Sequence, residues 1–118
     1  GWIPVDPLTL ETKFPAVYAI GDVTSVGTPK AGVFAEGQGA VVVEAIAARV
    51  ESAVSSRTYG GNGVCYMEFG DEVVAKVDIT FPAGHAPFGE FGAASEEFAA
   101  DKLEFVATRL VRWFGEGV

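Results

Sequence analysis

The chain has 118 residues, enough for one small domain or for part of a larger protein, and 49% of them are hydrophobic. Its formal net charge of −8 argues against nucleic-acid binding, because phosphate contacts need clustered Lys and Arg. No uncharged apolar run reaches about 18 residues, so no transmembrane helix is expected, and the first residues do not read as a signal peptide. The one cysteine excludes an intrachain disulfide and fits a reducing compartment such as the cytoplasm.

A short apolar run near the start of the chain ends abruptly in Gly21 and Asp22. Residues 2–7 predict a short strand and turn before it, and residues 16–20 predict a buried parallel strand. The glycine lets another molecule approach the backbone, and the carboxylate stands at the carboxyl end of the strand, where ligands bind in open α/β sheets. The structural alternative is a buried strand that ends in a Gly-Asp turn without any ligand.

A long helix is predicted from Ala31 to about Glu51. Its residues are apolar on nearly every side, which is typical of a buried helix. Gly37 and Gly39 each cost up to about 1 kcal/mol in a helix interior, so we expect another backbone to pack closely there. The helix N-terminus carries partial positive charge and could face an anionic or electron-rich cofactor atom. Left uncovered, such a helix predicts self-association, most simply as a two-fold homodimer, with the last helix of the chain as a second candidate surface.

Two alternating segments follow a Gly-rich turn. Residues 73–81 alternate apolar and polar side chains, and residues 64–69 place Cys65, Met67 and Phe69 on one strand face. With the turn signal at residues 70–72 between them, the two segments predict an antiparallel hairpin. Cys65 lies on the same face of its strand as Met67.

A loop rich in Pro and Gly is expected from residue 82 to residue 94. Ser95 is an N-cap candidate for a last helix that ends near Phe114, where Gly115 stops it. The order of elements predicts an α/β fold, here as an α+β fragment.

Residues 19–22, Ala-Ile-Gly-Asp, resemble the second flavin-binding motif of the flavoproteins with two dinucleotide-binding domains, which are the pyridine nucleotide-disulfide oxidoreductases and their relatives. The resemblance implies that the Asp holds the ribityl chain of FAD. It also implies that the following helix points its N-terminus at the pyrimidine end of the flavin ring, which stabilises negative charge on the reduced flavin. The cofactor-binding residues implied are Gly21, Asp22, Lys30, Ala31 and Gly32.

Within that superfamily the chain resembles sulfide:quinone oxidoreductases and the flavin subunit of flavocytochrome c sulfide dehydrogenases. Three segments carry the likeness: residues 29–32 (Pro-Lys-Ala-Gly), residues 63–70 (Gly-Val-Cys-Tyr-Met-Glu-Phe-Gly) and residues 102–115, which end Arg-Trp-Phe-Gly. The resemblance implies that Cys65 is a catalytic, redox-active cysteine that faces the flavin. It would pair with a second cysteine from an earlier part of the protein.

The resemblance also implies a domain organisation and a function. Residues 1–56 would end an FAD-binding, Rossmann-like domain, and residues 57–118 would form a hairpin-plus-helix region. The whole protein would transfer electrons from sulfide or a related reductant through flavin to a quinone or a cytochrome.

No Gly-x-Gly-x-x-Gly loop occurs that could cradle the FAD pyrophosphate. We therefore expect the chain to be the C-terminal part of a larger protein, inactive by itself, that depends on upstream FAD- and NAD-binding domains. Two alternatives stay open: another flavoprotein of the superfamily, such as a type II NADH dehydrogenase, and a non-enzymatic assembly module.

Several residues have a plainer interpretation as well. A lone cysteine on a strand is often a small buried hydrophobe, and this applies to Cys65. His85, the one histidine, is expected in a surface loop, and no metal site is predicted around it. The basic-aromatic end of the last helix, residues 109–114, suits peripheral contact with a membrane. Packing of Trp113 and Phe114 against the domain is the alternative.

Overall fold

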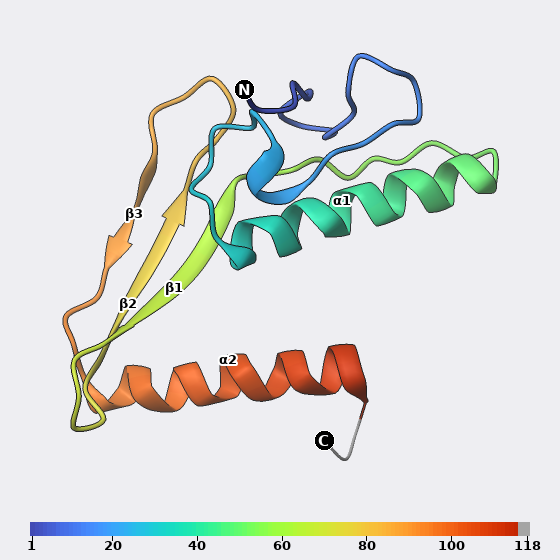
Figure 1. Cartoon of the computed structure of the whole chain (residues 1–118). Coiled ribbons are helices and arrows are strands. Elements are labelled where there is room, and N and C mark those ends of the chain that lie inside the picture. The colour runs from blue at the N-terminus through green and yellow to red at the C-terminus, as the bar shows by residue number, and fades with distance from the viewer. Residues whose placement is uncertain (116–118) are drawn as a thin grey trace. The chain divides into compact units, whose positions relative to one another are not determined.

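The computed structural model describes residues 1–115 and divides the chain into two compact units (Figure 1). The first unit comprises Gly1–Gly63 with Ile79–Phe88, and the second comprises Val64–Asp78 with Gly89–Val118. Two helices and a three-stranded antiparallel sheet in the order β1-β2-β3 make this an α+β fold, whereas the Rossmann-like character of its first part stays a prediction. The elements are the 3-10 turn η1 (Gly21–Val23), α1 (Gly32–Val50), β1 (Asn62–Glu68), β2 (Val74–Thr80), β3 (Phe88–Phe91) and α2 (Glu96–Phe114).

The first helix, α1, lies where the sequence predicts it. Only one stripe of it is buried, however, and the opposite face is open: Val43 is 68% exposed and Val50 is 80% exposed. The helix therefore carries apolar residues on nearly every side but buries only one side. Its buried residues are Phe34, Gln38, Val41, Val42 and Ala48. The core cluster of the first unit consists of Leu10, Val41, Val42 and Tyr59, with Val5, Tyr18 and Val26 packed against it.

The strand predicted at residues 16–20 does not form a regular element. This part of the chain makes only isolated bridges, an antiparallel one between Glu11 and Tyr18 and a parallel one between Ile3 and Thr24. A parallel strand in a sheet interior needs neighbours along its whole length. Within the described residues, the segment meets such neighbours at single positions only, so it stays extended without becoming a strand of a sheet.

The predicted hairpin is confirmed as β1 and β2 (Figure 1). At its turn the Phe69 N–H donates to the Val73 carbonyl at 2.9 Å, and at its far end the Phe81 N–H donates to the Gly61 carbonyl at 3.0 Å. Both pairs belong to one register, so the hairpin runs its full length without a slip. The unexpected element is β3, a four-residue strand inside the segment predicted to be a loop.

Side-chain alternation assigns the two faces of the hairpin within the second unit. The ring of Tyr66 meets the ring of Phe105 on α2, with 5.3 Å between ring centroids in an edge-to-face arrangement. The first half of helix α2 therefore packs against the Tyr66 face of the hairpin. Cys65, the preceding residue on β1, belongs to the opposite face.

The last helix, α2, begins and ends as predicted. Ser95 is its N-cap, and the hydroxyl oxygen accepts a hydrogen bond from the Phe98 N–H at 3.4 Å. Ser95 also exchanges both backbone hydrogen bonds with Val74 of β2, at 2.9 and 3.2 Å. Gly115 follows the helix with a φ of +80°. Among the described residues, no helix combines the length and the apolar character that a membrane span requires.

Candidate functional site

The Gly21–Asp22 turn is the best-defined polar feature of the first unit. Gly21 has a φ of +77°, a left-handed conformation that favours glycine, and it opens the 3-10 turn η1. Its carbonyl accepts from both the N–H of Thr24, at 3.1 Å, and the hydroxyl of Thr24, at 2.9 Å. Thr24 is fully buried, whereas Asp22 is exposed. The turn therefore holds a carboxylate outward on a backbone that is fixed from within.

The side chain that fixes this turn is Gln38 of α1, which the sequence analysis did not select. Its amide oxygen accepts from the Gly21 N–H at 2.6 Å, and its amide nitrogen donates to the Thr28 hydroxyl at 3.3 Å. Only 1% of Gln38 is exposed. A signal was present in the sequence, because Gln38 lies four residues after Phe34 and three before Val41 on the same helical stripe. A neutral polar residue on an apolar stripe indicates a buried hydrogen-bond partner.

Lys30 closes the loop between the turn and α1. Its ammonium donates to the Thr24 carbonyl at 2.6 Å and lies 4.5 Å from the ring centroid of Trp2. Both contacts act at the start of the helix, where a lysine is otherwise disfavoured by the helix dipole. The lysine therefore connects the loop to the first residues of the chain.

The N-terminus of α1 has no side chain that caps it. Ala31 is the N-cap residue, with φ −145° and ψ 150°, and Gly32 is the first helical residue and is exposed. No acidic residue stands in the first turn. The positive end of the helix dipole is therefore not neutralised by the helix itself.

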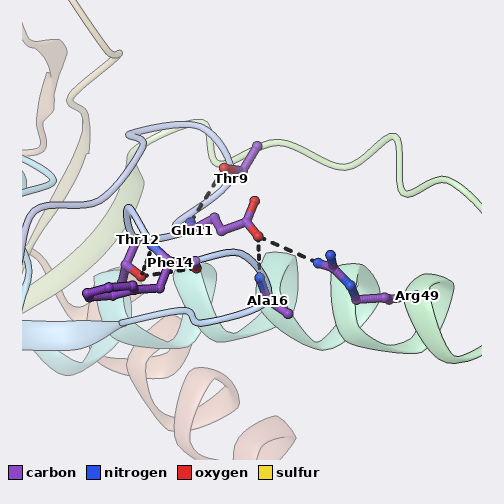
Figure 2. A network of polar contacts seen from close by, with 6 residues as sticks. All are labelled: Thr9, Glu11, Thr12, Phe14, Ala16 and Arg49. Atoms are coloured by element: carbon purple, nitrogen blue, oxygen red, sulfur yellow. Dashed lines mark hydrogen bonds and ion pairs between the residues drawn. The ribbon is translucent and has the colours of Figure 1, made fainter.

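A polar network fixes the segment that leads to the turn (Figure 2). The Glu11 carboxylate accepts from the Ala16 N–H at 2.6 Å and lies 3.5 Å from the Arg49 guanidinium of α1. The Thr12 hydroxyl accepts from the Phe14 N–H at 3.1 Å. This network anchors the irregular segment to α1 in place of the regular strand that was predicted.

A pocket of about 270 Å³ lies beside this segment. It is smaller than the range of roughly 300–1,000 Å³ that is usual for small-molecule sites. Its lining is mainly apolar and consists of Ile3, Pro4, Thr12, Lys13, Phe14, Val17, Tyr18 and Ala19.

Of the predicted site residues, those at the turn and at the helix start all belong to the first unit, whereas Cys65 lies on β1 in the second unit. Cys65 is a free, half-buried thiol. On its face of the hairpin, Met67 is 39% exposed, so this face is partly open. Gly37 and Gly39 meet side chains and not a backbone: a Cβ on Gly37 would lie 3.3 Å from the Tyr59 ring.

A second polar cluster, also missed by the sequence analysis, lies between the hairpin and α2. The Lys76 ammonium lies 2.5 Å from the Asp101 carboxylate and 5.9 Å from the centroid of the Tyr66 ring. The hydrogen bond from Lys76 lowers the pKa of Asp101, and the same bond raises the pKa of Lys76. Burial, followed by a hydrogen bond to Asp101, raises the pKa of Tyr66. The alternation of β1 and β2 could have placed Tyr66 and Lys76 on one face, but not their partner on α2.

Within residues 1–115, no three side chains among His, Cys, Asp and Glu gather in a way that could hold a metal ion. His85 is exposed, as predicted for a loop residue. The chain matches no protein-family model, and no curated protein sequence is significantly similar to it.

Proposed function

We propose that this chain supplies one wall of the flavin site in an FAD-dependent oxidoreductase related to the sulfide:quinone oxidoreductases, as the C-terminal part of a larger polypeptide. One observation carries the proposal. The Gly21–Asp22 turn is fixed by the buried Gln38 and presents an exposed carboxylate beside the chain that leads into α1. The hydrogen bonds to Gly21 fix the backbone of the turn, so the carboxylate that follows projects from a defined position.

Each residue of this wall has a distinct role in the proposal. The Asp22 carboxylate accepts hydrogen bonds from ribityl hydroxyls, and Gly21 leaves room for the cofactor to approach. The uncapped start of α1, at Ala31 and Gly32, offers N–H groups and the positive end of the helix dipole to an electron-rich edge of the flavin ring. Lys30 holds the loop between them. FAD, when bound, supplies the electron-transfer chemistry of the flavoprotein.

The remaining parts of the site must come from elsewhere in the protein. Upstream FAD- and NAD-binding domains would supply the pyrophosphate cradle, and they would cover the open face of α1. A sulfur-containing or related reductant would be the electron donor, and a quinone or a cytochrome the acceptor. The reducing environment implied by the lone cysteine favours a cytoplasmic location, with peripheral membrane contact where a quinone is the acceptor.

The test is an Asp22→Ala substitution in the polypeptide that contains this chain together with its upstream domains. A carboxylate–hydroxyl hydrogen bond is worth roughly 1.5–3 kcal/mol, so FAD affinity should fall about 10- to 100-fold. Flavin retained after gel filtration measures the effect. Glu51→Ala, which removes an exposed carboxylate at the far end of α1, is the matched control and should retain its flavin. Equal flavin occupancy in both variants would show that the turn does not bind FAD.

A second substitution separates the branches of the superfamily. Cys65→Ser in the same polypeptide should abolish sulfide-dependent quinone reduction and leave FAD bound, because the thiol and not the fold is removed. Met67→Ala, on the same strand face, is the control for packing. Two results would contradict this prediction: Cys65→Ser could keep full sulfide-dependent activity, or the wild-type protein could fail to oxidise sulfide. Either result would make Cys65 a packing residue and would favour another flavoprotein of the superfamily.

A further inference from the structure

Helix α2 has two apolar faces, and only one of them packs within its own unit. The packed face carries Phe105, which meets Tyr66, and Asp101, which pairs with Lys76. The second face is turned away from it by about 150°, counting 3.6 residues per turn. We call this face the outer stripe. It consists of Leu103, Val106, Leu110, Trp113 and Phe114, which are 72%, 44%, 39%, 58% and 65% exposed.

The outer stripe is large for a surface that stays in water. Aromatic side chains present roughly 150–250 Å² each, so the stripe leaves on the order of 500 Å² of apolar surface exposed. Monomeric soluble proteins rarely expose more than this in one patch. The area approaches the roughly 800 Å² per partner of a standard protein interface. Its members follow steps of three and four residues, which is the spacing of a helix-pairing seam.

We propose that the outer stripe binds the outer stripe of a second copy of this chain, with the two helices antiparallel about a two-fold axis close to Val106 and Ala107. This proposal does not depend on the flavin proposal. The face is graded in size, because Ala99, one turn before Leu103, continues the outer stripe with a small side chain, whereas its C-terminal end carries Trp113 and Phe114. In an antiparallel pair, the large side chains at the C-terminal end of each helix pack against the small side chains at the N-terminal end of the other. In a parallel pair, the large side chains of the two copies would meet each other.

The charges along α2 favour the same orientation. All of its acidic residues lie in its N-terminal half, and its C-terminal half carries arginines without any acid. Lys102, in the acidic half, is held by Glu68 of its own chain. In an antiparallel pair the acidic half of each helix lies beside the basic half of the other, and the two helix dipoles oppose each other. Asp101 is paired with Lys76 of its own chain, so the acidic residues that face this contact are Glu96, Glu97 and Glu104. The arginines are Arg109 and Arg112.

The same charges disfavour a membrane as the occupant. Helices that lie in a membrane interface are rich in Lys and Arg on their polar side, and anionic lipid attracts them. The polar side of α2 is acidic in its first half, and the chain carries a net charge of −8. A second copy of the chain would bury the outer stripe without placing these carboxylates against lipid phosphate groups.

The test is sedimentation velocity of the 118-residue chain across a micromolar concentration series. We expect a monomer–dimer equilibrium for the wild type. Leu103→Glu with Leu110→Glu should raise the dissociation constant at least about 100-fold, because both leucines lie centrally in the seam. Both are exposed, so the far-UV circular dichroism should not change. Val43→Glu, on the exposed face of α1, is the matched control and should leave the dimer intact.

Orientation is tested by disulfide cross-linking in a Cys65→Ser background. Ala107→Cys lies beside the proposed axis and should form an intermolecular disulfide rapidly, whereas Ala100→Cys, one heptad earlier, should not. In a parallel pair, each of the two positions would lie beside its own copy in the partner, and both variants would cross-link at similar rates. Equal rates of cross-linking would therefore overturn the antiparallel arrangement.

Four other results would overturn the proposal. The wild type could remain a monomer at high micromolar concentration. The glutamate double variant could remain a dimer, or Val43→Glu could abolish the dimer and thereby place the interface on α1. Finally, a monomer could bind vesicles of phosphatidylcholine and phosphatidylserine through the two leucines, which would assign the stripe to a membrane.

Discussion

Gln38 shows how one buried amide can determine the shape of an exposed turn. It is 1% exposed, and it provides the hydrogen-bond acceptor for the Gly21 N–H and a donor for Thr28. Gly21 needs its left-handed conformation, and a Cβ there would lie 3.6 Å from the Cβ of Ala35. The position of Asp22 thus depends on a buried side chain of α1 as well as on the turn itself.

We predict that Gln38→Leu destabilises the chain by roughly 1–3 kcal/mol, because it leaves the half-buried Gly21 N–H without its acceptor. Urea denaturation followed by circular dichroism measures the change. Leucine has a similar volume and is a good helix former, so loss of packing or of helix propensity is a poor explanation for a large effect. Ala47→Leu, on the exposed side of α1, serves as the control. A change below about 0.5 kcal/mol for Gln38→Leu would mean that water replaces the amide.

At the scale of elements, the sequence predicts what depends on local periodicity and capping. The bounds of α1 and α2 follow from helical spacing, from Ser95 at one start and from Gly115 at one end. The hairpin follows from alternation around a turn signal. These features are encoded within a few neighbouring residues, so no knowledge of tertiary contacts is needed.

The remaining elements depend on tertiary contacts that periodicity does not reveal. β3 has no clear alternation of apolar and polar residues, and it forms a strand because it pairs with the edge of β2. Directly after β3, the Gly92 N–H donates to the Lys76 carbonyl of β2 at 2.8 Å. Residues 16–20 show the reverse case, since an apolar run without a continuous neighbour stays irregular. Gln38 and Asp101 were missed for the same reason: their partners lie far away in sequence, Gly21 for Gln38 and Lys76 for Asp101.

The Lys76–Asp101 pair joins β2 to α2 and makes their packing dependent on pH. The folded-state pKa of Asp101 is lowered from its ordinary value of 3.8, so its contribution to stability is present above pH 3.8 and is lost as pH falls through the lower folded value. The pKa of Lys76 is raised from 10.5, so its contribution is present below pH 10.5 and is lost as pH rises through the higher folded value.

We therefore predict that Asp101→Asn lowers the free energy of unfolding at neutral pH and has progressively less effect as the pH falls below 3.8. Urea denaturation of both proteins at neutral and at acidic pH measures this. Glu104→Gln removes an exposed carboxylate from the same helix and should show a smaller difference at neutral pH. If the difference between wild type and Asp101→Asn is the same at both pH values, the ion pair contributes nothing to stability.

At the scale of the whole molecule, the flavin site that we propose is incomplete within these 118 residues. It has no Gly-x-Gly-x-x-Gly loop, and the pocket beside residues 12–19 measures only about 270 Å³. In the resembled family the pyrophosphate loop provides a large share of the cofactor contacts. Two exposed apolar surfaces remain, the open face of α1 and the outer stripe of α2. We assign the first to upstream domains and the second to a copy of the chain.

We predict that the purified 118-residue chain does not retain FAD through gel filtration, whereas the longer polypeptide with its upstream domains does. Absorbance of the protein peak in the flavin region measures both. The missing pyrophosphate cradle is the physical reason, because anion binding by a helix start alone is weak. A yellow protein peak from the 118-residue chain would contradict this prediction and would place a complete flavin site within it.

The paired backbone hydrogen bonds between Val74 and Ser95 have a consequence for hydrogen exchange. Ser95 is both a partner of β2 and the N-cap of α2, so the strand and the helix begin at one shared junction. The amide protons of Val74 and Ser95 can meet solvent only when this junction opens. Both amides should therefore exchange at similar, slow rates, and the first turn of α2 should become labile together with the start of β2. When the N-terminal end of α2 frays, the start of β2 should therefore lose its hydrogen bonds to Ser95 at the same time.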